Sequence, residues 1–326
     1  MSISLLDQVD NSSREHQTTN VSPAARLRAT MAACRVSFTW FGTQKTLTRE
    51  QKERAAEAFD AEGASLSAGK KLLDTTHPAY RAVTAVRGKV DAHWRGLTLP
   101  YPEAGVRLIR HDQVEEFAER MTDYKVDLDD AVLHLNRHYD ALKRAAIERL
   151  GSLYNSSDYP ETLVGLFGVA WDFPNVEPPD YLVQLAPGLY EQEQARVAAR
   201  FEEAVQLAES AFLEEFSRLV AHLCERVAED GSETKVFRDS AVGNLTEFFD
   251  RFRSLNVRSN AQLDALVAQA QRAVRGVRPQ DLRDSQSLRS QVGDQLVRVR
   301  TSLDAMLIEK PRRRILRQSP SSSGAE

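Results

Sequence analysis

One stretch of the chain, residues 188–231, constrains the fold more than any other. Apolar residues recur along it at steps of four, four and three, which is an eleven-residue repeat. They are Val197, Phe201, Val205, Ala208, Phe212, Phe216, Leu219, Leu223 and Val227. This spacing predicts one continuous apolar stripe along a single helix. At 1.5 Å per residue such a helix is a rod of roughly 60 Å, which needs a long partner to cover its stripe.

A second amphipathic stretch, at about residues 113–151, is the expected partner. Its apolar residues follow alternating steps of three and four, a pattern that favours a left-handed seam with another helix. They begin with Val114, Phe117, Met121, Tyr124 and Leu128. We therefore expect a mainly α protein in which rods at about 113–151 and 189–230 form a long antiparallel helical hairpin, similar to a coiled coil.

Short strands are expected at one end of this hairpin. Val36, Phe38 and Trp40 alternate with polar residues, which is typical of a half-buried strand. Residues 169–173 have a similar character, and residues 106–109 are a third, weaker candidate. We expect these strands to pair in a small sheet, within an α+β knob built from residues 34–42 and 153–187.

The remaining sequence completes one elongated domain at residues 23–310. Three further helices are predicted within residues 238–309, at about 238–255, 260–275 and 279–309, because cap residues precede apolar repeats there. The polar segment 1–22 and the basic, serine-rich tail 311–326 have too few apolar residues to form a core, so we expect both to be disordered.

Composition narrows the class of protein. Hydrophobic residues make up 42% and charged residues 28% of the chain, as in ordinary globular proteins. The longest apolar run, 163–171, is about half the length of a membrane span, and the acidic first ten residues do not resemble a signal peptide. There are two distant cysteines, Cys34 and Cys224, and we expect Cys224 to be a buried thiol because it lies beside the apolar stripe. We expect a cytoplasmic protein without a membrane partner.

Charge is unevenly distributed along the chain. Residues 251–326 carry 15 Lys and Arg against 7 Asp and Glu, whereas the whole chain has a net charge of −4. Fourteen of those bases are arginine, which suits bidentate binding of phosphate. The candidate residues for binding an anion or a partner are Arg272, Arg275, Arg278, Arg312, Arg313, Arg314 and Arg317. A simpler interpretation, which we favour, is that these arginines pair with the acidic face of the long helix.

No motif predicts an enzyme or a cofactor. The glycine-rich stretch 63–71 has the wrong spacing for a phosphate-binding loop and Lys71 stands where Ser or Thr should hold magnesium. His134 and His138 are four residues apart and could share a metal, with Asp130 one turn earlier, but two ligands on one helix are half of a site. We therefore predict no catalytic residues, no metal and no cofactor.

Three segments resemble a known family. They are MAACRVSFTWFGTQK at 31–45, VAWDFPNVEPPDY at 169–181 and FRDSAVGNLTEFFDRFRSLNV at 237–257. They are similar to a bacterial and phage family defined only as a domain of unknown function, and the likeness covers about residues 29–317. The resemblance implies a genomic context near MoxR-type AAA+ ATPases and von Willebrand factor A proteins, in a phage or mobile element, and it implies no catalytic residues.

Two functions are consistent with these observations. The first is a non-enzymatic helical scaffold or adaptor in a protein assembly, alongside an AAA+ ATPase or self-associated as a homo-oligomer, because long exposed helices offer large surfaces to partner helices. The alternative is a protein that associates with nucleic acid through its arginine-rich C-terminal third, which predicts binding that weakens steeply with salt.

Overall fold

The computed structural model describes residues 21–228 and 240–309. Most of these residues are helical, and two antiparallel β-sheets complete the fold. The segment expected to be disordered at 1–22 lies outside the described residues except for Val21 and Ser22, and the expected tail 311–326 lies wholly outside them. Ser22 accepts a hydrogen bond from the backbone N–H of Ala25 and so caps α1 (Pro23–Thr30).

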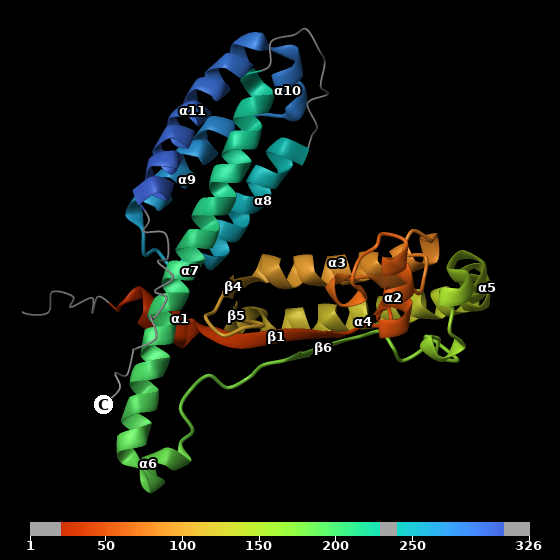
Figure 1. Cartoon of the computed structure of the whole chain (residues 1–326). Coiled ribbons are helices and arrows are strands. Elements are labelled where there is room, and N and C mark those ends of the chain that lie inside the picture. Colours follow the sequence, from red (N-terminus) through yellow and green to blue (C-terminus); the bar gives the residue numbers. More distant parts are fainter. Residues whose placement is uncertain (1–20, 229–239, 310–326) are drawn as a thin grey trace, which may run out of the picture.

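The predicted long helix is α7 (Pro187–Ala228), with 42 residues. Its stripe is buried from Val197 to Leu223, apart from the partly buried Leu219. Three other helices cover it: α1, α8 (Ser240–Leu255) and α11 (Gln286–Glu309). Figure 1 shows α11 and α8 flanking the upper part of α7, with α9 (Ala261–Val274) behind and the short α10 (Pro279–Asp284) at the top. We call this group the bundle.

The predicted hairpin between the two rods is wrong. The rod at 113–151 consists of α4 (Val114–Arg137) and α5 (Tyr139–Leu150), which meet at His138. Its main partner is α3 (Pro78–Leu97), whereas α7 packs chiefly in the bundle. Each rod needed another helix to cover its apolar face, but the spacing of its apolar residues did not specify which helix that would be. Helix α3 precedes α4 closely in the sequence and has a matching apolar face.

A four-stranded sheet joins the two helical groups. Its strand order is β4 (Thr98–Pro100), β5 (Val106–Arg110), β1 (Met31–Thr39) and β6 (Gly168–Asp172). The pairing of the three predicted strands is thereby confirmed, with Val36 opposite Trp171 and Cys34 opposite Arg107. The sheet is not a knob at the end of a hairpin of rods; it lies between two cores.

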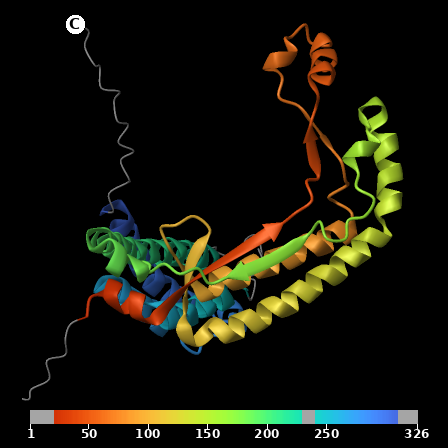
Figure 2. The same cartoon turned by 90° about the horizontal axis from the view of Figure 1, so that it is seen from below.

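The two faces of this sheet serve different cores because side chains alternate along a strand. Ala33 and Leu108 pack with the apolar residues of the bundle. Their neighbours Cys34 and Ile109 pack with α3 and α4. We call the sheet with α3 and α4 the arm. Figures 1 and 2 show the arm leaving the middle of α7 sideways, so that the molecule has the outline of a bent lever.

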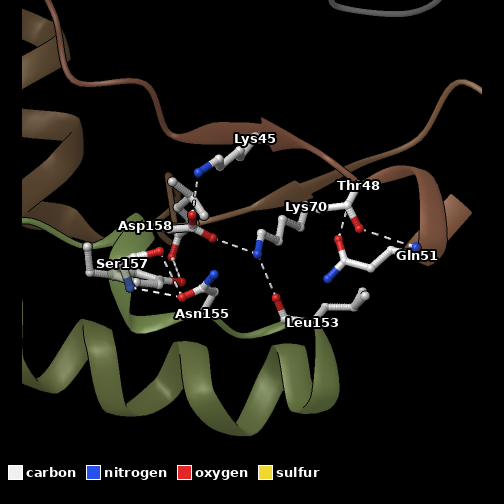
Figure 3. A network of polar contacts seen from close by, with 10 residues as sticks. Lys45, Thr48, Gln51, Lys70, Leu153, Asn155, Ser157 and Asp158 are labelled. Carbon is white, nitrogen blue, oxygen red and sulfur yellow. Dashed lines mark hydrogen bonds and ion pairs between the residues drawn. The ribbon is translucent and has the colours of Figure 1, made fainter.

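A small two-stranded sheet lies toward the far end of the arm. It pairs β2 (Gln44–Thr46) with β3 (Gly69–Lys71), and between them the chain forms α2 (Arg49–Glu57) and a 3₁₀ turn. Thr48 and Gln51 cap α2 reciprocally, as their spacing suggests (Figure 3). The glycine-rich stretch 63–71 is therefore a turn and a strand rather than a loop that opens a helix.

Two lysines and one aspartate fasten this small sheet to the turn after α5. Lys70 Nζ lies 2.6 Å from one carboxylate oxygen of Asp158, and Lys45 Nζ lies 2.5 Å from the other (Figure 3). Lys70 also donates to the backbone carbonyl of Leu153 at 2.7 Å. The side chains of Lys70 and Asp158 are buried, so the charges are shielded from water and bind one another strongly.

No helix in the described part of the chain is both long and apolar enough to cross a lipid bilayer. Both cysteines are buried and free, as expected for Cys224.

Candidate functional site

The three described candidate arginines lie at one end of the bundle. Arg272 is in the last turn of α9, Arg275 caps its C-terminus and Arg278 directly precedes α10. All three side chains are exposed, and no ion pair joins them to another described residue. Arg272 and Arg275 line a cavity of about 410 Å³ together with Asp250, and Arg278 is outside its lining. Arg312, Arg313, Arg314 and Arg317 lie outside the described residues.

One arginine of the C-terminal third, which is not among the candidate residues, pairs with the acidic face of α7. Arg251 of α8 forms an ion pair with Glu215 of α7, with both side chains partly buried. Arg300 instead pairs with Asp304 of its own helix, at 3.9 Å. The simpler interpretation was made for the candidate arginines, and among the described residues no ion pair joins the side chains of Arg272, Arg275 and Arg278 to α7.

A third histidine, His77, lies beside the predicted pair of His134 and His138. The ring centroid of His138 lies 4.9 Å from that of His134 and 5.3 Å from that of His77. Nδ1 of His77 accepts a hydrogen bond from the backbone N–H of Ala79 and caps α3, so this nitrogen is occupied. Among the residues that the structure describes, no group of three or more His, Cys, Asp and Glu side chains is arranged to hold a metal ion.

A different feature stands out on the surface: the lower end of α7 extends beyond the helices that cover it (Figure 1). From Pro187 to Arg196 this helix has no fully buried residue, whereas Val197 begins the buried stripe. The short helix α6 (Tyr181–Leu185) precedes it and packs against its start. Backbone N–H groups of Leu189 and Tyr190 donate to the carbonyl of Ala186, which fixes the bend between the helices.

Large apolar side chains are concentrated at this bend. Their exposed fractions are 63% for Tyr181, 47% for Val183, 78% for Leu185 and 46% for Leu189. Water contact with apolar surface is unfavourable by about 25 cal/mol for each Å². Four such side chains gathered within nine residues therefore form a candidate interaction surface. We call residues 181–189 the docking end.

The charges around the docking end are predominantly negative. Asp180 and Glu191 are exposed and form no ion pair with another described residue. Glu193 is neutralised by Arg196 at 3.0 Å on the same helix, and Glu177 is neutralised by Arg28 of α1. The apolar patch is consequently flanked by two uncompensated carboxylates.

Sequence reasoning missed the docking end because it treated residues 153–187 as part of the knob. The indication was present in the five residues Tyr181–Leu185, four of which are apolar and which follow Pro178, Pro179 and Asp180. Their exposure could not be predicted, since it depends on how far α1 and α11 extend along α7.

Comparison with known proteins gave no match: no protein-family model fits the sequence, and the searches of curated proteins and of solved structures returned none.

Proposed function

We propose that the protein is a non-enzymatic helical adaptor that holds a protein partner at its docking end. The observation that carries this proposal is the group of exposed apolar side chains at Tyr181, Val183, Leu185 and Leu189. The docking end is held away from both cores by the long helix α7 (Figure 1). A partner can therefore bind there without displacing any part of the arm or the bundle.

The partner segment is an amphipathic helix whose apolar face is flanked by Lys or Arg. Helices bind apolar surfaces through side chains spaced three and four residues apart. Basic flanks would neutralise Asp180 and Glu191, which have no ion-pair partner in the described chain. A second copy of the same docking end would bring these carboxylates together, and like charges oppose that arrangement.

As the source of this partner helix we propose a MoxR-type AAA+ ATPase or a von Willebrand factor A protein, in a phage or mobile-element context. Only the resemblance of segments 31–45, 169–181 and 237–257 supports this identity. The chemistry of the docking end supports the basic amphipathic helix whatever its source.

The test compares Leu185→Asp with Val297→Asp. Val297 is an exposed apolar residue of α11, with an exposed fraction of 51%, so it is a matched control far from the docking end. Tagged proteins are used to capture partners from the native host after nuclease treatment. We expect Leu185→Asp to weaken capture of a specific protein at least about 30-fold, as loss of an interface hot spot does. Equal capture by both variants would contradict the proposal.

Light scattering separates the adaptor from a homo-oligomer. We expect the wild-type protein to remain a monomer over a wide concentration range. A dimer that is abolished by Leu185→Asp would show that the docking end binds a second copy and not a different protein.

The exposed positions of Arg272 and Arg275 favour nucleic-acid binding as a second candidate function. It predicts that the joint change of Arg272, Arg275 and Arg278 to Ala, with removal of residues 311–326, abolishes binding to nucleic acid. The binding of the wild type should weaken steeply between 50 and 200 mM salt, on the order of 10³-fold for several phosphate contacts. Binding that survives these changes would show that the arginine-rich C-terminal third is not the site, and would contradict this second candidate.

A further inference from the structure

A cavity of about 470 Å³ lies where the arm meets the bundle. The arm contributes the end of α3 and the strands β4 and β5, and the bundle contributes α7 and α8. Four arginines line it: Arg95 and Arg107 from the arm, and Arg218 and Arg251 from the bundle. None of these residues belongs to the docking end or to the arginines singled out in the sequence.

Arg107 is the arginine of this cavity whose guanidinium is held by neutral acceptors. It lies on β5, and its guanidinium donates from Nε to the hydroxyl of Thr98 at 2.6 Å and from Nη2 to the Thr98 carbonyl at 2.9 Å. These acceptors are neutral, and no ion pair joins Arg107 to another described residue. Burial, together with the nearby positive charges of Arg95 and Arg251 and against the opposing effect of Asp91, lowers the pKa of Arg107 to about 10.

The charges of the cavity do not balance. Arg95 is paired with Asp91 at 2.8 Å and Arg251 with Glu215. Arg107 and Arg218 have no ion-pair partner in the described chain. Glu247 lines a neighbouring cavity that also includes Arg218 and Arg251, and its negative charge offsets part of the excess positive charge of the arginines. Arg107 and Arg251 are partly buried, whereas Arg95 and Arg218 are exposed, so an anion entering the cavity would meet two partly desolvated and two solvated guanidinium groups.

The cavity also has an apolar wall, made by Leu99, Phe212 and Leu255. Its volume lies within the range of about 300–1,000 Å³ that is usual for small-molecule sites. Guanidinium groups bind phosphate oxygens in pairs, because their N–H groups form a planar fork. A phosphate group could therefore lie among the arginines while an attached organic group contacts the apolar wall.

We propose that this cavity binds a small phosphate-bearing anion, which bridges the arginines of the arm and those of the bundle. The ligand is either an inorganic polyphosphate or an organic phosphate ester, since both present the same oxygen atoms to the arginines. An extended nucleic-acid strand is a poorer fit, because the volume corresponds to a single small ligand.

The experiment titrates full-length protein with pyrophosphate and, separately, with adenosine diphosphate by calorimetry. We expect 1:1 binding. Tighter binding of adenosine diphosphate identifies an organic ester that uses the apolar wall, and tighter binding of pyrophosphate identifies an inorganic ligand. Absence of binding for both probes at millimolar concentration would overturn the proposal.

Variants locate the binding. Arg218 is exposed, so Arg218→Ala should fold normally and weaken probe binding about tenfold, as expected for one lost charge-assisted hydrogen bond. Arg107→Lys keeps the charge and loses the fork, and should weaken binding by a similar factor. The matched control is Arg298→Ala, which changes an exposed arginine of α11. Equal loss in the control, or no loss in Arg218→Ala and Arg107→Lys, would show that the probe binds elsewhere.

Discussion

The buried ammonium group of Lys70 lies 2.6 Å from the equally buried carboxylate of Asp158, and Lys45 approaches the same carboxylate from the solvent side (Figure 3). Asp158 therefore balances the charge of Lys70 in a place that water does not reach. It also connects the small two-stranded sheet to the turn after α5.

Asp158→Asn should destabilise the arm strongly. It leaves the buried Lys70 without its counter-ion, and such losses cost about 3–5 kcal/mol in the free energy of unfolding. Urea denaturation of the two proteins measures this difference. Lys45→Met is the matched control, because the Lys45 side chain is 56% exposed and its removal should cost less than about 1 kcal/mol. A smaller effect for Asp158→Asn than for Lys45→Met would contradict the assignment.

The same pair predicts a pH dependence. Hydrogen bonds from Lys45 and Lys70 hold the pKa of Asp158 below its ordinary value. Because the pKa of this carboxyl is lower in the folded than in the unfolded state, its ionised form stabilises the fold. This stabilisation is complete above the unfolded pKa of about 3.9 and is lost as the pH falls through the folded pKa. The stability difference between the wild type and Asp158→Asn should consequently narrow below about pH 4. A difference that widens on acidification would refute this ionic role.

Substitution of Phe216 tests how much the packing of the bundle core contributes to stability. Its side chain is fully buried in α7 and stacks on Phe248 of α8, with ring centroids 5.1 Å apart. Phe216→Ala should lower the free energy of unfolding by about 3–5 kcal/mol, because it removes apolar contacts and leaves a cavity. Phe59→Ala changes a phenylalanine that is 80% exposed and should shift stability by less than about 0.5 kcal/mol. Thermal unfolding of both variants and of the wild type measures these two changes in stability.

Both thiols should be unreactive in the folded protein. Burial raises the pKa of Cys34 to about 12 and also raises the pKa of Cys224. The thiolate is the reactive form, so at pH 8 the native protein should label with a disulfide reagent far more slowly than the unfolded protein. Two equivalents of reagent should react once denaturant is added. Rapid labelling of Cys34 without any loss of helical circular dichroism would contradict its placement between the sheet and α3.

Local patterns predicted the individual elements well. The eleven-residue repeat from Val197 onward corresponds to the buried face of α7, and the alternation around Phe38 corresponds to β1. These patterns depend on the period of one helix or strand, which a sequence displays directly. Residues 69–71 were missed, since Gly69, Lys70 and Lys71 have no apolar alternation and their strand depends on pairing with β2.

Partner choice was not readable from the sequence. The apolar face of α4 fits any long apolar helix, and α3 rather than α7 covers it. The arginine-lined cavity was hidden for a related reason: Arg107 and Arg251 lie 144 positions apart, and only the meeting of arm and bundle brings them together. Arg107 also falls between the buried Val106 and Leu108, in a strand whose pattern predicts packing rather than binding.

The most direct test of the adaptor proposal is site-specific photo-crosslinking in the native host. The reactive group is placed at residue 185 in the docking end, and at residue 297 as the control. The proposal predicts that residue 185 becomes linked to another protein, within a peptide that forms a basic amphipathic helix, and that residue 297 does not. A link from residue 185 to a second copy of this chain, or equal labelling from both positions, would contradict it.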